Sequence, residues 1–295
     1  MKRVSELNLP RADQIKLIVC DVDGTLLDGN HVFHERNHRA LAYLRKQKPE
    51  LPIVLATGRQ RSSVIHIREP LELDAFPSIH LNGCVVYNKG EVFSHVGLSK
   101  ELVHSMFTNV LEDDTTAILA YDHNKVYPLK NDSKSDSIRF LKEVGEVVSL
   151  ETPSKTTLER VLSDELPVTK LVIYERNLKR LDEIKVSLLK NDQKEYTITQ
   201  SFPFALEIIP SSANKATGLT NILTKIYPHI HFDEVLSFGD GENDVCMFET
   251  TGHSVGICNG MPAAIQAAKY ISCSPNYEGA VGEILEHIYE IPPYH

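Results

Sequence analysis

Short apolar runs in the first part of the chain alternate with segments of helical periodicity. The apolar runs are IKLIVC at 15–20, LPIVLA at 51–56 and SIHL at 78–81, and helical patterns lie near 34–47 and 59–68. A strand that is apolar at nearly every position is typical of a parallel sheet, because helices cover both of its faces. We therefore expect these runs to be buried parallel strands.

The C-terminal part of the chain repeats this alternation. Helical patterns at 214–227 and 242–250 flank an apolar run at 234–238, an extended segment follows at 253–257, and Pro262 stands in the first turn of a further helix. Alternating strands and helices form right-handed βαβ units. The predicted fold class is α/β, with a Rossmann-like, doubly wound parallel sheet.

The middle of the chain has a different pattern, in which strands are paired around turns. It contains two candidate hairpins, at 84–96 and 115–129, with a helix near 99–113. Further strands at 168–174 and 195–200 flank another helical pattern. These elements indicate an α+β domain inserted into the α/β domain. The predicted domains are a first core segment at 1–86, an inserted domain at 87–205 and a second core segment at 206–295.

The composition restricts the class of partner. The net charge of −9 argues against a general nucleic-acid binder, since backbone phosphates are bound by clustered lysine and arginine. The chain has no run of about 18 uncharged apolar residues, and its first residues lack the apolar core of a secretory signal. Five scattered cysteines without a CxxC pair argue against a disulfide framework or a zinc site. We expect a cytoplasmic protein with no nucleic-acid or membrane partner, either a monomer or a small homo-oligomer.

Candidate catalytic residues follow several predicted strands and open one predicted helix. They are Asp21 and Asp23 after the first apolar run, Thr57, Gly58 and Arg59 after the second, Lys215 at the start of a helix, and Asp240, Asn243 and Asp244 after the strand at 234–238. Ligands of open α/β sheets bind outside the carboxyl ends of the strands. These residues are therefore expected to meet at one edge of the sheet.

Taken singly, these residues have ordinary structural explanations. Aspartate and glycine form turns, a threonine before a helix is often its N-cap, and most lysines are solvated. An EF-hand calcium loop is excluded, because Thr25 and Val32 occupy two of the positions where that loop needs ligands. The GDGEND segment lacks the third glycine of a dinucleotide-binding loop, which disfavours a nucleotide-dependent oxidoreductase.

The combination of residues indicates phosphoryl transfer. The carboxylates of Asp21 and Asp240 can converge on Mg²⁺, which prefers oxygen ligands and bridges to phosphate oxygens. Thr57 offers a hydroxyl, Gly58 a backbone N–H that an anion can approach, and Lys215 a positive charge. A nucleophile, a cation and donors around the phosphoryl oxygens are what phosphoryl transfer requires.

These motifs resemble those of the haloacid dehalogenase (HAD) superfamily of phosphatases, in particular the Cof-type branch with a large α/β (C2-type) cap domain after the third core strand. The matching segments are DVDGTLL at 21–27, ATGR at 56–59, Lys215 within IIPSSANKATGL, and GDGENDVCMF at 239–248. The resemblance extends to LNG at 81–83 and to the segment at 256–281. Ala216, Gly260 and Glu278 depart from the family pattern, but none of them lies at a proposed catalytic position.

The resemblance implies a role for each candidate residue. Asp21 would be the nucleophile that forms an aspartyl-phosphate, and Asp23 would act as general acid and then as general base. Mg²⁺ would be bound by the carboxylates of Asp21 and Asp240 and by the backbone carbonyl of Asp23. The phosphoryl oxygens would be bound by Thr57, Gly58, Lys215 and Asn243, with Asp244 supporting Lys215 or a metal-bound water and Arg59 facing either the substrate or the protein.

The expected function is Mg²⁺-dependent hydrolysis of phosphate monoesters of a small phosphorylated metabolite, with a sugar phosphate favoured. The inserted cap domain would close over the site, exclude water and select the leaving group. Two alternatives stay open at this point. One is a phosphotransferase or phosphosugar mutase on the same scaffold, and the other is a non-catalytic phospholigand-binding protein, which would be expected to lack the nucleophile.

Three histidines near the first motif have the spacing of one helix face. They are His31, His34 and His38, and no carboxylate or HExxH pattern accompanies them. We interpret them as part of a solvated helix surface and not as metal ligands.

Overall fold

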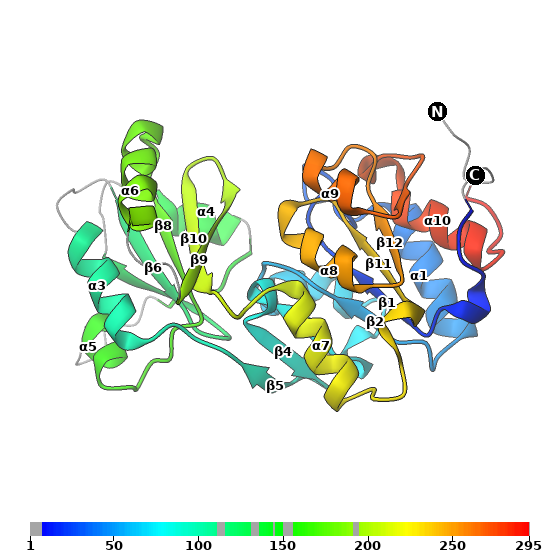
Figure 1. The fold of residues 1–295 in the computed structure, drawn as a ribbon, viewed down its shortest axis with the longest axis horizontal. Helices are drawn as coiled ribbons and strands as arrows, with labels where there is room; N and C mark the ends of the chain where they lie inside the picture. The colour runs from blue at the N-terminus through cyan, green and yellow to red at the C-terminus, as the bar shows by residue number, and fades with distance from the viewer. Residues whose placement is uncertain are drawn as a thin grey trace. The chain divides into compact units, whose positions relative to one another are not determined.

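The computed structural model describes residues 8–110, 116–130, 136–143, 145–149, 156–190 and 195–294 (Figure 1). Within these ranges, none of the helices combines the length and the apolar character needed to cross a membrane. The chain divides into two compact units. The first comprises Met1–Gly58, His66–Phe93 and Asn214–His295, and the second comprises Arg59–Ile65 and Ser94–Ala213. The domain limits at 86/87 and 205/206 stay a prediction.

The first unit is built on a parallel sheet in the order β13–β12–β11–β1–β2 (Figure 1). Its strands are β1 (Leu17–Cys20), β2 (Ile53–Leu55), β11 (Val235–Gly239), β12 (His253–Gly256) and β13 (Tyr270–Ile271). Every residue of β1, β2 and β11 is buried, as expected for strands covered on both faces. The predicted α/β fold with a parallel sheet is confirmed.

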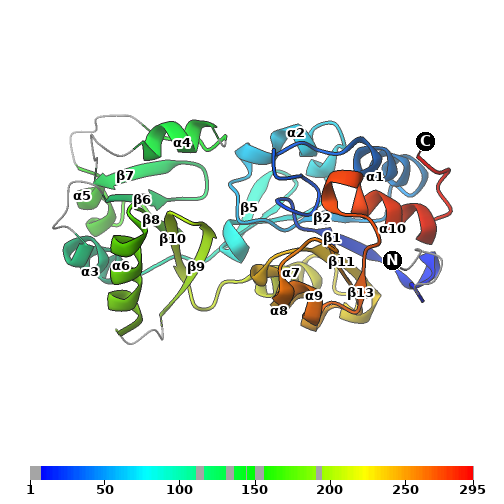
Figure 2. The same cartoon turned by 90° about the horizontal axis from the view of Figure 1, so that it is seen from above.

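Helices cover both faces of this sheet (Figure 2). They are α7 (Lys215–Lys225), α8 (Val245–Thr250) and α9 (Pro262–Ala267) on one face, and α1 (Glu35–Gln47) and α10 (Ala280–Ile288) on the other. Leu17 and Val19 of β1 belong to the same apolar cluster as Leu219 of α7 and Phe248 of α8. Because side chains alternate along a strand, the intervening Ile18 points to the opposite face.

Two helices are shorter than the sequence pattern predicts. The helix predicted at 242–250 begins as an α-helix only at Val245, because Glu242–Asp244 forms a 3₁₀ turn. The helix predicted near 59–68 is reduced to short pieces, of which the last is α2 (Ile65–Arg68). Both differences lie directly after strand ends, where the backbone is shaped by contacts to other strands and loops.

The third predicted strand joins a separate sheet. β3 (Ser78–His80), β4 (Val85–Asn88) and β5 (Glu91–His95) pair in this order, with β3 antiparallel to β4. A parallel bridge between Ala56 and Ile79 is the link to the end of β2. The expectation that 78–81 is a strand of the parallel sheet is therefore wrong, because β3 pairs mainly with β4 and, among the described residues, only one bridge joins it to the segment after β2.

The second unit is built on an antiparallel sheet in the order β7–β6–β8–β10–β9 (Figure 1). Its elements are β6 (Ala117–Tyr121), β7 (Val126–Lys130), β8 (Lys170–Tyr174), β9 (Tyr196–Phe202), β10 (Ala205–Pro210), α3 (Lys100–Val110), α4 (Ser137–Glu143), α5 (Thr157–Leu162) and α6 (Leu178–Lys190). Leu171 and Leu206 of the sheet form an apolar cluster with Met106 of α3 and Leu181 of α6. This is the α+β architecture predicted for the insert, although β10 was not predicted. The end of the helix predicted near 99–113 lies outside the described residues.

Charged side chains are buried within the second unit. Lys170 of β8 and Glu207 of β10 are both buried, with Lys170 Nζ 3.6 Å from Glu207 Oε2. Lys170 Nζ also lies 4.4 Å from the ring centre of Tyr121. Burial raises the pKa of Glu146 to about 7, which the positive charges of Lys170 and Arg59 only partly oppose. Among the described residues, Glu146 Oε2 has no hydrogen-bond partner.

The raised pKa of Glu146 predicts a pH-dependent stability. The folded state holds this proton more tightly than the unfolded state, so the unfolding free energy contributed by Glu146 is full below pH 4.5 and falls as the pH rises to about 7. The loss is at most about 3 kcal/mol, from roughly 1.4 kcal/mol for each pKa unit. Replacing Glu146 with glutamine removes this loss, so the variant gains stability relative to wild type between pH 5 and pH 8, measured by urea unfolding.

A matched control for this experiment is Glu143→Gln, which removes an exposed carboxylate three residues away. The control should keep the wild-type pH dependence, and other titrating groups cancel when each variant is compared with wild type. If Glu146→Gln and wild type lose stability in parallel from pH 5 to pH 8, Glu146 does not have the raised pKa described here.

Candidate active site

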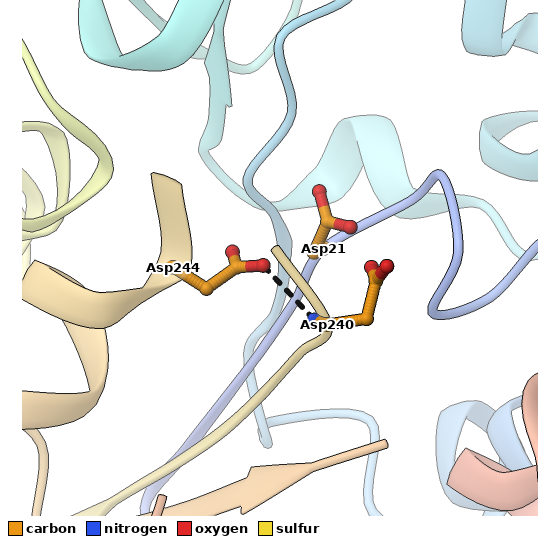
Figure 3. Close-up of side chains that lie close together, drawn as sticks. All are labelled: Asp21, Asp240 and Asp244. Atoms are coloured by element: carbon orange, nitrogen blue, oxygen red, sulfur yellow. Dashed lines mark hydrogen bonds between the residues drawn. The ribbon is translucent and has the colours of Figure 1, made fainter. Parts of the chain in front are cut away.

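Two acidic residues from adjacent strands lie together at the carboxyl edge of the parallel sheet. Asp21 follows β1, and Asp240 follows β11. The two strands are in register, with Cys20 opposite Phe238, and the Asp21 backbone N–H donates to the Phe238 carbonyl at 3.0 Å. Both strands therefore end at the same level. Figure 3 shows the side chains of Asp21 and Asp240 close together, with Asp244 beside them.

Lys215 is the positive charge of this group. It is the first residue of α7 and is completely buried. Its Nζ donates to Asp21 Oδ1 at 2.5 Å and to Asp244 Oδ1 at 2.6 Å. The helix start is fixed by Asn214, whose side-chain oxygen accepts the Thr217 backbone N–H at 2.8 Å. The N-cap thus sets the position from which the lysine reaches both carboxylates.

The charges in this group strongly perturb one another. Burial raises the pKa of Asp21 well above its usual range; Lys215 opposes the shift, while Asp244 and Asp240 add to it. Burial raises the pKa of Asp240 to about 6, with Asp244 adding to the shift. For Lys215, burial by itself would lower the pKa, but the two paired carboxylates outweigh it and the pKa is raised. Three carboxylates thus share one ammonium group, and a further cation would relieve their repulsion.

The loop after β11 is held by Asp244 of the same loop and by residues of the DVDGTLL segment. The second oxygen of Asp244 accepts the backbone N–H groups of Asp240 at 3.0 Å and Gly241 at 2.9 Å. Thr25 is completely buried and donates its hydroxyl to Asp240 Oδ1 at 2.9 Å. Gly24 has a φ of +77°, and a Cβ there would overlap with the Asp240 carboxylate. The DVDGTLL segment therefore positions Asp240 of the GDGENDVCMF segment.

The segment after β2 approaches the same loop through Asn82. Thr57 is completely buried, and its carbonyl accepts the Asn82 backbone N–H at 3.0 Å. A Cβ on Gly58 would lie 3.1 Å from Asn82 Oδ1, so this glycine leaves little space beside the asparagine. Asn82 Oδ1 accepts a hydrogen bond from Asn243 Nδ2 at 3.0 Å. Thr57, Gly58 and Asn243 are thereby connected.

Asp23 differs from the buried group in its exposure, and Arg59 is part of the other unit. The Asp23 side chain is 42% exposed, and its Oδ1 lies 3.4 Å from His31 Nδ1. Arg59 belongs to the second unit, where its charge acts on Glu146. The predicted ligand from Asp23 is its backbone carbonyl, so the exposure of the side chain does not bear on that prediction.

Sequence reasoning gave no role to Thr25 or Asn82. Their positions in the sequence could have indicated a role. Thr25 directly follows the DVDG segment, and Asn82 lies in the LNG segment that follows β3. Their partners are Asp240 and Asn243, which are distant in the sequence. Only the folded chain shows that these pairs meet.

The donor set fits a hard divalent cation. One carboxylate oxygen from each of Asp21, Asp240 and Asp244 lies within 4.8 Å of the others. The ligands are oxygen atoms, which Mg²⁺ prefers to the nitrogen and sulfur ligands typical of zinc. The excess negative charge of this group supports the same conclusion.

Comparison with known proteins identifies the family. The chain matches the haloacid dehalogenase-like hydrolase family over residues 18–285. It belongs to this family. An uncharacterized hydrolase of Schizosaccharomyces pombe is 47% identical to this HAD hydrolase over 287 residues, which cover 97% of this chain and 94% of that protein. The predicted membership of the Cof-type phosphatase branch is confirmed, and the protein is a phosphatase of this superfamily.

Two further relatives extend the comparison. The 5-amino-6-(5-phospho-D-ribitylamino)uracil phosphatase YcsE of Bacillus subtilis is 26% identical over 282 residues, covering 95% of this chain and 99% of that protein. The crystal structure of a haloacid dehalogenase-like hydrolase from Bacteroides thetaiotaomicron aligns with a TM-score of 0.79 at 26% identity, over 93% of this chain and 99% of that chain. The similarity thus includes both units.

Proposed function

We propose that this HAD phosphatase hydrolyses phosphate monoesters of small metabolites through an aspartyl-phosphate on Asp21, with Mg²⁺ as cofactor. The observation that carries the proposal is the buried Asp21, which is held by Lys215 at 2.5 Å beside the carboxylates of Asp240 and Asp244. A carboxylate fixed against a lysine in a water-poor site can attack phosphorus while the lysine offsets the charge of the phosphoryl oxygens.

The chemistry takes place in two steps. A carboxylate oxygen of Asp21 attacks phosphorus, the bond to the leaving-group oxygen breaks, and Asp23 gives that oxygen a proton. Water then attacks the phosphorus of the aspartyl-phosphate, Asp23 takes a proton from the water, and inorganic phosphate and the Asp21 carboxylate are released. Asp23 thus returns to its starting state, as a catalyst must.

The remaining polar residues bind the phosphoryl group and the metal. Thr57, the Gly58 backbone N–H, Lys215 and Asn243 are assigned to the phosphoryl oxygens. Mg²⁺ would be held by Asp21, Asp240 and the Asp23 carbonyl, and when bound it supplies positive charge that favours approach of a phosphate dianion. Asp244 holds Lys215 in place, as its 2.6 Å hydrogen bond supports.

The favoured substrates are phosphate esters of small polyhydroxylated metabolites, such as sugar phosphates. The relative YcsE is named for a phosphoribityl compound, in which the phosphate is carried by a sugar-derived polyol chain. We take this as support for the class of leaving group and not for that compound itself.

A panel of phosphorylated metabolites with Mg²⁺ tests this function. We expect release of inorganic phosphate from at least one sugar or polyol phosphate, loss of the activity with EDTA, and recovery when Mg²⁺ is restored. Release from none of the panel would contradict hydrolysis of this class. Formation of a new phosphorylated product without inorganic phosphate would assign a phosphotransferase or mutase instead.

A further inference from the structure

The residues between Asp28 and Phe33 form a tightly closed loop beside the first motif. Asp28 Oδ1 accepts the backbone N–H groups of Asn30 at 2.8 Å and Val32 at 2.9 Å. Backbone hydrogen bonds join the Asp28 N–H to the Val32 carbonyl at 3.1 Å and the His31 N–H to the Asp28 carbonyl at 3.0 Å. Leu27 forms a bridge with Asp23 on one side and with Phe33 on the other. The loop is therefore fixed to the segment that carries Asp23.

His31 has an unfavourable backbone conformation in this loop. Its φ is +60°, in the left-handed region, where a side chain costs roughly 1–2 kcal/mol. The preceding residues are Gly29 and Asn30, both of which adopt this region more readily than most residues do. Because the hydrogen bonds to Asp28 impose the turn, the histidine side chain is presented from a backbone that is fixed and strained.

The side chain that this turn presents lies against the carboxylate of Asp23. His31 Nδ1 is 3.4 Å from Asp23 Oδ1, and the two side chains are 44% and 42% exposed. An exposed pair of this kind adds little to stability, about 0–1 kcal/mol, so this contact by itself does not offset the cost of the left-handed backbone. The Asp23 side chain is half-exposed, so a neighbour that is itself fixed can restrict its rotamers and thereby its orientation.

We propose that His31 is a positioning residue, which holds the Asp23 carboxyl group in the orientation needed for proton transfer to the leaving oxygen. The proposal rests on the proposed function, in which Asp23 is the general acid. A misplacement of about 1 Å in a reacting group can lower a rate by about 100-fold, so restraint of one side chain has a measurable kinetic effect.

The proposal predicts a dependence on the leaving group. A sugar alkoxide leaves poorly unless Asp23 protonates it, whereas p-nitrophenolate leaves readily without a proton. The value of kcat/KM covers the steps up to departure of the leaving group, and hydrolysis of the aspartyl-phosphate is common to both substrates. Loss of His31 should therefore lower kcat/KM for a sugar phosphate much more than for p-nitrophenyl phosphate.

Three variants separate the side chain from the backbone conformation. His31→Gly keeps the left-handed turn and removes the imidazole, and we expect kcat/KM for the sugar phosphate to fall about tenfold or more, with p-nitrophenyl phosphate changed less than about twofold. His31→Asn also tolerates the turn, places a polar side-chain atom as many bonds from the backbone as Nδ1, and should recover much of the loss. Glu290→Gly, which replaces an exposed residue that also has a left-handed φ, of +52°, is the matched control and should resemble wild type.

The outcomes distinguish this proposal from the proposed function. If wild type hydrolyses neither substrate, the proposed function fails. If wild type hydrolyses both and His31→Gly is unchanged on both, or is slowed equally on both, then His31 does not position the general acid. A selective loss with the sugar phosphate, reversed in His31→Asn, supports the positioning role.

Discussion

Replacing Asp21 with asparagine is expected to lower phosphate release by about 1000-fold or more, because a neutral amide is a poor nucleophile. The variant keeps the shape of the side chain and its position at the end of β1. Lys215 keeps a charged partner in Asp244, at 2.6 Å, so the lysine is not left alone in the interior. The change therefore removes the reacting group without removing the framework around it.

Two measurements make the Asp21 result specific. Thermal unfolding should show that Asp21→Asn remains folded, and mass spectrometry of acid-quenched protein should find a phosphoryl group on the Asp21 peptide of wild type only. Asp233→Asn is the control, because Asp233 is an exposed aspartate near the opposite end of β11. If Asp21→Asn turned over its substrate at the wild-type rate, another residue would have to be the nucleophile.

The apolar pattern of the chain predicted the parallel sheet but not every strand partner. The runs at 15–20 and 51–56 form β1 and β2, because burial is the dominant requirement of such apolar sequences. The run at 78–81 is shorter and contains Ser78 and His80, and β3 pairs antiparallel with β4 instead of joining the parallel sheet. β10 was missed because Glu207 interrupts its apolar character, and in the folded unit this buried charge lies 3.6 Å from Lys170 of β8.

The positions of the candidate residues after strands and at a helix start could be predicted from the sequence, while their catalytic roles stay a prediction. The residues that hold these candidates in place could not be predicted, because they make contacts between segments that are distant in the sequence. The hydrogen bond between Thr25 and Asp240 is an example. The histidines show a different error. α1 begins at Glu35, so His31 lies outside the helix and does not share a helix face with His38. The left-handed turn that brings His31 to Asp23 is set by Asp28 and leaves no periodic signal in the sequence.

Replacing Lys215 with methionine is expected to reduce both activity and stability. The lysine is completely buried, and both Asp21 and Asp244 accept hydrogen bonds from its Nζ. Removing one member of a buried ionic group typically costs roughly 3–5 kcal/mol, because the remaining charges lose their partner. Activity should fall by about 100-fold or more, since a positive charge that stabilises the transferred phosphoryl group is lost. Lys225→Met, at the exposed end of α7, is the matched control and should change neither property.

A second variant separates the two effects of Lys215. In the double variant Lys215→Met/Asp244→Asn, one orphaned carboxylate is gone while an amide oxygen can still accept the Asp240 or Gly241 N–H. We expect urea unfolding to show partial recovery of stability, whereas phosphate release stays low because the positive charge is still absent. Recovery of activity in the double variant would mean that Lys215 only neutralises Asp244. Wild-type stability in the single variant would mean that the buried carboxylates do not need the lysine. With both results as expected, Lys215 balances buried charge in the fold and also serves the phosphoryl group, which explains why a lysine is buried here at all.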